Sequence, residues 1–268
     1  MRYVYFSKSL QELDVAALIR FCQAVGLDGL DLAVRPGYPI HPDNAERALP
    51  QAAKQVREAG LIIGLVTAPT HLIAPEDAMA QRLYDACARA RVPAIKIGYF
   101  PYRGDFERDL AAAQKALEGF ARLSEKTGVR TCYHTHSGGH LGNNGAGLRL
   151  LLAHCDPHYV GVFADTGHLA LGGGPIAMEL DMVRSWLALL AIKDIAWDKQ
   201  GDSWRFRVVP AGRGIVRWAD VARAVKQVRF DGTVSLHGEY ELSDLDERQR
   251  VAREELIYLK KLLGDPAH

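Results

Sequence analysis

The chain has 268 residues, of which 48% are hydrophobic and 24% are charged, and its formal net charge is +1. This length allows a core of normal size, and the near-neutral charge excludes an extended nucleic-acid or membrane footprint. The four cysteines stand singly with no CxxC pair, which indicates buried thiols in a reducing compartment. With no secretory leader pattern and no apolar run long enough to cross a membrane, we predict a cytoplasmic protein.

Apolar runs typical of β-strands alternate with amphipathic helical stretches along the whole chain. The predicted strands, in chain order, are Tyr3–Ser7, Gly29–Val34, Leu61–Thr67, Ala94–Phe100, Arg130–His136, Tyr159–Asp165, Leu187–Asp194 and Thr233–Tyr240. The predicted helices are Leu13–Val25, Asn44–Ala59, Asp77–Ala90, Asp105–Thr127, Gly147–Cys155, Met178–Trp186, Trp218–Val228 and Leu245–Leu263. Several of these helices end at a glycine suited to a C-cap, as at Gly26, Gly60 and Gly128.

Strict alternation of strands and helices implies right-handed crossovers and a parallel sheet. Eight strand–helix pairs suit a closed barrel better than an open sheet. The first strand–helix turn, residues 6–12, lacks the GxGxxG pattern, which counts against a dinucleotide-binding Rossmann fold. No linker or shift in composition divides the chain. We therefore predict the α/β class and a single-domain (β/α)₈ TIM barrel over residues 1–268.

Polar and ionisable residues gather at the carboxyl ends of the predicted strands, where such barrels carry their active sites. A structural barrel interior would favour Val, Ile and Leu there, because burying unpaired charge costs several kcal/mol. One such residue alone is readily explained as a satisfied core polar group, but six strands with polar residues at the same end indicate a functional site. The candidates are Asp31, Arg35, Lys96, His134, His136, Asp165, Lys193, His237 and Glu239, with His168 expected on the loop after Asp165.

Two motifs give the chain a family resemblance that covers essentially its whole length. They are DTGHLALGGG at Asp165–Gly174, and AIKDIAWDK followed by VPAGRGIV within Ala191–Val216. Together with the barrel order, they resemble the xylose-isomerase-like superfamily, which contains sugar isomerases and epimerases, inosose dehydratase and endonuclease IV. The YHTHSG stretch that begins at Tyr133 is also similar to a Tyr-His-x-His segment of inosose dehydratases.

This resemblance implies a divalent-metal site, because family members usually bind one metal through Glu, Asp, His and Glu on strands five to eight. Asp165 matches by position, whereas His134 and His237 stand where a Glu is usual and Ala191 stands where many relatives have His. The implied ligands are His134, Asp165, His237 and Glu239, which suit Mn²⁺, Zn²⁺, Co²⁺ or Fe²⁺ better than Mg²⁺. The alternative is that the metal has been lost and the histidines act as acid–base groups or bind sugar hydroxyls.

The remaining candidates each have a functional and a structural interpretation. Lys193 either stabilises an enolate oxygen of the substrate or pairs with Glu239 or Asp165. His168 is a candidate for metal binding or a substrate hydrogen bond, and His136 either holds His134 or contacts substrate. Substrate contacts are predicted for Asp31, Arg35, His41, Lys96 and Trp197, with ion pairs, solvated loop charges or ordinary packing as the alternatives.

The resemblance implies a sugar isomerase or epimerase in which Glu239 abstracts a proton next to a carbonyl, an enediolate forms, and Lys193 and His168 polarise the oxygens. The same chemistry ending in loss of water would give a lyase, which the YHTH segment favours. A third hypothesis, a metal-free sugar-binding protein, rests on Ala191 and the two changes to histidine. The expected partner is a small sugar or polyol, with a homo-oligomer usual in such proteins. The neutral charge argues against an endonuclease.

Overall fold

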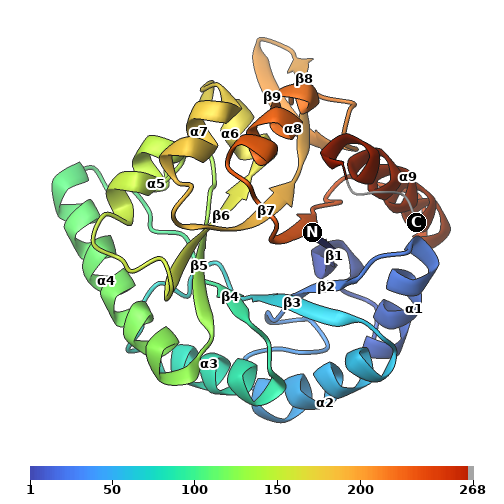
Figure 1. Cartoon of the computed structure of the whole chain (residues 1–268), viewed down its shortest axis with the longest axis horizontal. Coiled ribbons are helices and arrows are strands. Elements are labelled where there is room, and N and C mark those ends of the chain that lie inside the picture. Colours follow the sequence, from blue (N-terminus) through green and yellow to red (C-terminus); the bar gives the residue numbers. More distant parts are fainter. Residues whose placement is uncertain (265–268) are drawn as a thin grey trace.

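In the computed structural model, which describes residues 1–264, eight parallel strands close into a barrel ringed by helices (Figure 1). Each strand pairs with its neighbour in chain order, and the last pairs with the first. The barrel strands are β1 (Arg2–Phe6), β2 (Gly29–Ala33), β3 (Ile62–Thr67), β4 (Ala94–Lys96), β5 (Arg130–His134), β6 (Val160–Asp165), β7 (Leu187–Ile192) and β10 (Thr233–Leu236). The predicted (β/α)₈ barrel is confirmed.

The long helices begin and end at residues that satisfy their free backbone groups. Asp14 and Asp105 accept backbone N–H groups at the starts of α1 and α4, and Gly26 and Gly128 end them in the left-handed region at φ 87° and 71°. Both glycine stops are as predicted. The helices are α1 (Val15–Val25), α2 (Ala45–Glu58), α3 (Ala78–Ala90), α4 (Phe106–Thr127), α5 (Gly145–Leu151), α6 (Thr166–Gly172), α7 (Ile176–Met182), α8 (Trp218–Gln227) and α9 (Leu245–Leu263), with a 3₁₀ turn at Ser7–Leu10. None of the helices in residues 1–264 is long and apolar enough to cross a membrane.

A small apolar layer fills the barrel below the polar strand ends. It is separate from the larger core between strands and helices, and it consists of Val4, Leu65, Ala94, Cys132, Phe163, Leu189 and Ala191. The Phe163 ring lies 4.7 Å from the His134 ring and 5.6 Å from the His237 ring, measured between centroids. This layer therefore forms an apolar floor beneath the two histidines.

Several strands are shorter than predicted, so some of the polar residues lie on the loops after the strands rather than on the strands themselves. β5 ends at His134 and β10 at Leu236, so His136, His237 and Glu239 lie on the segments that follow the strands. The loop expected after Asp165 is instead the short helix α6, which places His168 in its first turn.

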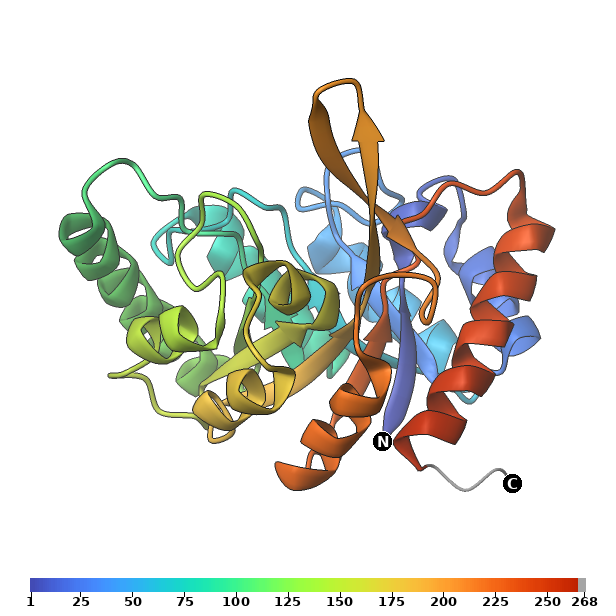
Figure 2. The same cartoon turned by 90° about the horizontal axis from the view of Figure 1, so that it is seen from above.

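A two-stranded hairpin was not predicted. It consists of β8 (Asp194–Gln200) and β9 (Ser203–Val209), and it projects beyond the barrel on the side opposite the start of β1 (Figure 2). Trp197 on β8 faces Phe206 on β9 across the hairpin, with ring centroids 5.9 Å apart, and both are largely exposed. The base of the hairpin is anchored by the buried Asp194, whose carboxylate accepts hydrogen bonds from the loop at residues 212–216.

Candidate functional site

Three buried side chains meet at the carboxyl ends of β5 and β6 and just after β10. His134, Asp165 and His237 each offer a ligand atom, and these atoms all lie within 4.8 Å of one another. His134 Nε2 is 3.3 Å and His237 Nδ1 is 3.8 Å from Asp165 Oδ2. The two imidazole rings are nearly parallel, with centroids 5.5 Å apart. Parallel strands bring their carboxyl ends to one rim, which is why residues so distant in sequence converge. We call these three residues the His/Asp/His cluster.

Asp165 has two roles because its two carboxylate oxygens face different ways. Oδ1 accepts the backbone N–H groups of Gly167 and His168 at 2.9 and 3.0 Å and so caps α6. Oδ2 has no hydrogen-bond partner among the described residues and faces the cluster. Burial would raise the pKa of Asp165, but the nearby Lys193 and imidazoles outweigh it and hold the pKa well below its ordinary value. The cap thus fixes an ionised oxygen in the site.

The cluster contains buried polar atoms that the described part of the chain leaves without hydrogen-bond partners. They are His134 Nε2, Asp165 Oδ2 and both ring nitrogens of His237. Each such atom costs about 1–3 kcal/mol unless something satisfies it. Two imidazole nitrogens and one carboxylate oxygen are a donor set that fits Zn²⁺, Mn²⁺, Co²⁺ or Fe²⁺. Burial also keeps the pKa of His134 well below its ordinary value, so its imidazole is neutral, as metal ligation requires.

The fourth implied ligand, Glu239, lies beside the cluster and pairs with lysines. Its Oε1 is 2.9 Å from Lys193 Nζ and 3.6 Å from His237 Nδ1, and its other oxygen pairs with Lys8. Lys193 Nζ is also 3.5 Å from Asp165 Oδ2. Burial lowers the pKa of Lys193, but the two carboxylates outweigh this and raise it. Lys193 therefore supplies positive charge to the site, and a cation that enters has to move this ammonium group aside.

Ala191 stands where many relatives have a histidine, and it adds no ligand. It pairs with Asp165 in the β6–β7 ladder, is fully buried, and belongs to the apolar floor. The donor set of the site therefore comes from β5, β6 and the segment after β10.

His168 and His136 lie together at the edge of the cluster. His168 Nε2 is 3.3 Å from Lys193 Nζ and its Nδ1 is 2.9 Å from Ser137 Oγ. Both ring nitrogens therefore face groups that can only donate, because the Lys193 ammonium lies at Nε2 and the backbone N–H of Ser137 lies 3.3 Å from Nδ1. Burial, with the charge of Lys193, lowers the pKa of His168 to about 3, so its ring is neutral at physiological pH. The His136 ring packs on it with centroids 4.1 Å apart.

The pocket above the cluster contains two of the five predicted substrate-binding residues, together with three of the catalytic candidates. Arg35, Lys96, His136, Lys193 and Glu239 all line it. Asp31 was predicted to contact substrate at the rim, but it is buried beneath the pocket. There it accepts hydrogen bonds from the hydroxyls of Thr67 and Ser235 at 2.6 and 2.9 Å, and lies 3.6 Å from His237 Nε2. Asp31 therefore lies beside His237 without a hydrogen bond to its ring.

Two predicted contacts lie outside this pocket, and several residues that line it were not predicted. His41 Nδ1 is 3.6 Å from the exposed Asp43 carboxylate, and Trp197 lies on the hairpin with 44% of its surface exposed. Tyr99, which was not predicted, lines the pocket, and its hydroxyl is 3.3 Å from His134 Nδ1. No sequence signal identified it, because Tyr99 falls inside the predicted strand Ala94–Phe100, whereas β4 ends at Lys96.

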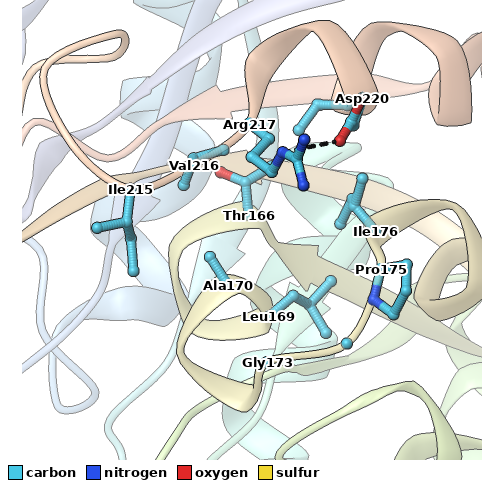
Figure 3. A pocket seen from close by; sticks show the side chains of 12 residues that line it. Thr166, Leu169, Ala170, Gly173, Pro175, Ile176, Ile215, Val216, Arg217 and Asp220 are labelled. Carbon is cyan, nitrogen blue, oxygen red and sulfur yellow. Dashed lines mark ion pairs between the residues drawn. The ribbon is translucent and has the colours of Figure 1, made fainter.

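A second, larger cavity lies against a different face of α6 and is unsuited to proton transfer (Figure 3). Thr166, Leu169 and Ala170 face it, as residues three and four apart share a helix face, whereas His168 projects elsewhere. Its charged groups, Arg217 and Asp220, pair with each other at 3.2 Å. The candidate site is therefore the pocket in the barrel mouth.

Sequence and structure comparisons agree with this architecture. The family model described as "Xylose isomerase-like TIM barrel" matches residues 19–262, so the chain belongs to this family. Similar solved structures include D-psicose 3-epimerase with D-tagatose from Clostridium cellulolyticum H10, with a TM-score of 0.79, 15% identity and coverage of 98% of this chain and 99% of that one. The IolI protein with a zinc atom has a TM-score of 0.78, 14% identity and coverage of 98% of both chains.

A third similar structure is the probable 3-DHS dehydratase AsbF from Bacillus anthracis. Its TM-score is 0.75 and its identity 14%, and the match covers 97% of this chain and 99% of that one. At such identities the likeness establishes the shared fold. No curated protein matches the sequence.

Proposed function

We propose that the protein is a metal-dependent sugar isomerase or epimerase that abstracts a proton next to a carbonyl group. The observation that carries this proposal is the His/Asp/His cluster, whose buried ligand atoms lie within 4.8 Å of one another beside Lys193 and Glu239. Similar folds are found in an epimerase solved with D-tagatose and in a zinc-containing protein, which supports the same assignment.

His134, Asp165 and His237 are the residues that would hold the metal. A divalent ion there supplies Lewis acidity, which stabilises negative charge on a carbonyl oxygen. The carboxylate of Asp31 stands 3.6 Å from His237 Nε2 and orients that ring toward the other two ligands. The Phe163 ring of the apolar floor packs against both imidazoles from below.

Glu239 is the proposed base. Burial raises the pKa of this carboxyl, but His237, Lys193 and Lys8 outweigh it and hold the pKa far below its ordinary value. Glu239 is therefore ionised at neutral pH and ready to accept the proton of a substrate C–H bond at Oε1. The electron pair of that bond forms a carbon–carbon double bond as the carbonyl π pair moves to oxygen, giving an enediolate. Protonation of the other face by solvent, with the abstracted proton released from Glu239, gives the epimer, whereas delivery of the proton from Glu239 to the neighbouring carbon gives the isomer.

Lys193 controls both the base and the substrate oxygen. While its ammonium group stays 2.9 Å from Glu239 Oε1, the carboxylate is a weak base. Turning toward a developing alkoxide would stabilise that charge and at the same time strengthen Glu239 as a base. His168 Nε2 lies 3.3 Å from Lys193 Nζ while that lysine still pairs with Glu239, so it offers the lysine a contact besides the carboxylate.

The test combines elemental analysis of the purified protein with proton exchange in D₂O. A panel of ketoses, aldoses and keto-polyols is incubated with the protein and followed by NMR and mass spectrometry. We expect one divalent ion per chain and deuterium at the carbon next to the carbonyl, with Glu239→Gln inactive and the exposed Glu241→Gln fully active. Loss of one water from the substrate would instead establish the lyase. Sugar binding with neither metal nor exchange would establish the non-catalytic binding protein.

A further inference from the structure

Two basic side chains in the pocket have no acidic partner within residues 1–264. Lys96, at the end of β4, is 1% exposed, and its Nζ has neither a hydrogen bond nor an ion pair. Arg35, two residues after β2, has a buried Nε without a hydrogen-bond partner. The other two basic residues of the pocket, Lys8 and Lys193, both pair with Glu239. On one side of the pocket the basic groups thus have a carboxylate partner, and on the other side they have none among the described residues.

Lys96 and Arg35 each contact the face of an aromatic ring. Lys96 Nζ lies 3.5 Å from the centroid of the Tyr99 ring, and Arg35 Cζ lies 5.5 Å from that of Phe6. A ring face attracts a cation but accepts no strong hydrogen bond, so these contacts leave the N–H donors unused. Between β2 and β4 the pocket is lined by Thr67, whose hydroxyl already donates to Asp31.

The two cations also repel each other. Burial lowers the pKa of Lys96 well below its ordinary value, and the charge of Arg35 lowers it further. Lys96 is buried without a direct ion pair, which is costly, whereas Arg35 is partly buried and only its Nε is left without a partner. An anion placed between them would accept from both donors and relieve the repulsion.

We infer that the β2–β4 side of the pocket binds an anionic group, so that the substrate is a sugar derivative carrying a carboxylate or a phosphate. This inference rests on the proposed function for the sugar part of the molecule. Arg35 and Lys96 are the two groups that would bind the anion, since both cations are good donors to carboxylates and phosphates. With its anionic end there, the carbonyl end of the substrate faces Glu239 and the His/Asp/His cluster.

The test is isothermal titration of the metal-loaded protein with matched ligands. The ligands are D-fructose, D-fructose 6-phosphate, 5-keto-D-gluconate and inorganic phosphate. We expect at least one anionic ligand to bind about tenfold or more tightly than D-fructose, and its affinity to fall as ionic strength rises. The better of the phosphate and the carboxylate identifies the anionic group.

Variants locate the effect. Lys96→Met and Arg35→Met are each expected to weaken the anionic ligand about tenfold or more and D-fructose less than about twofold. Lys226→Met removes the same charge from an exposed position on α8 and should change neither affinity. Circular dichroism confirms folding, and Arg35 is on a surface loop, so its variant keeps the test valid if Lys96→Met fails to fold.

Three results would overturn the inference: no anion of the set binds, D-fructose binds as tightly as the anionic ligands, or both variants weaken neutral and anionic ligands equally. Anion binding without proton exchange on any sugar would contradict the proposed function and leave the anion site standing. Proton exchange on neutral ketoses with no preference for anions would support the proposed function and contradict the anion site. The two proposals can therefore fail separately.

Discussion

Replacing Asp165 with asparagine would remove one charge from the centre of the site with little change in volume. The amide oxygen can still accept the N–H groups of Gly167 and His168, which Oδ1 accepts at 2.9 and 3.0 Å, so the α6 cap is kept. What is lost is the attraction between Oδ2 and Lys193 Nζ, 3.5 Å apart. At an effective dielectric constant of about 20 this attraction is worth about 5 kcal/mol before desolvation is subtracted.

The net loss of stability should be smaller than this attraction. Desolvation offsets part of it, and Lys193 keeps Glu239 as a partner at 2.9 Å. We expect Asp165→Asn to lower the free energy of unfolding of the metal-free protein by about 2 kcal/mol. The loss of a direct ligand should weaken Zn²⁺ binding more than about a hundredfold, which exceeds the usual effect of removing an outer partner.

Urea denaturation of the metal-free protein and competition of Zn²⁺ with a chromophoric chelator measure the two quantities. The matched control is Asp202→Asn at the exposed turn of the hairpin, which should change neither. Unchanged Zn²⁺ affinity in Asp165→Asn would refute the His/Asp/His cluster as the ligand set. A loss of stability above about 4 kcal/mol would show that the amide does not preserve the α6 cap.

Three further predictions concern other buried charges. Lys193→Met should slow proton exchange on the substrate by about a hundredfold or more without changing the metal content, as NMR and elemental analysis would show. Asp194 accepts hydrogen bonds from four backbone N–H groups within the described chain, so Asp194→Asn should lower stability to urea by about 2–3 kcal/mol, against about 0.5 kcal/mol or less for the exposed Asp202→Asn. Burial raises the pKa of Glu255 from 4.5 to about 7. The unfolded state therefore loses its proton first, and stability should fall by about 3 kcal/mol as pH rises from 4.5 to 7. Glu255→Gln should abolish this fall and Glu254→Gln should not, as denaturation across that pH range would show.

The barrel was predictable because the signals for it are local: apolar runs, amphipathic helices and glycine stops. The β8–β9 hairpin was not, since only Lys193 separates β7 from β8 and most residues from Trp197 to Val208 are at least partly exposed. Without a buried face, neither strand shows the alternation that marks a strand in sequence. The helix α6 contains two glycines, which weaken its sequence signal. It depends on the Asp165 cap and on close packing of Gly167 against Ile195.

The candidate site also has a part that the sequence predicts and a part that it does not. The three residues of the His/Asp/His cluster follow from the rule that parallel strands end at one rim. Tyr99 and Ser137 lie on loops whose paths the sequence does not specify, so their contacts with His134 and His168 were not predictable. The buried position of Asp31 depends on partners from β3 and β10, and no local pattern distinguishes it from a rim residue.

The hydrogen bond from Ser235 to Asp31 joins residues that are 204 positions apart in the chain. It ties the second strand to the last one, and the same carboxylate lies beside His237. A nascent chain that has not yet emerged beyond β7 contains His134, Asp165 and Asp31 but lacks the third ligand, His237. On the proposed function, metal binding would wait until synthesis is nearly finished, and tight Zn²⁺ binding would report that the ring of strands has closed.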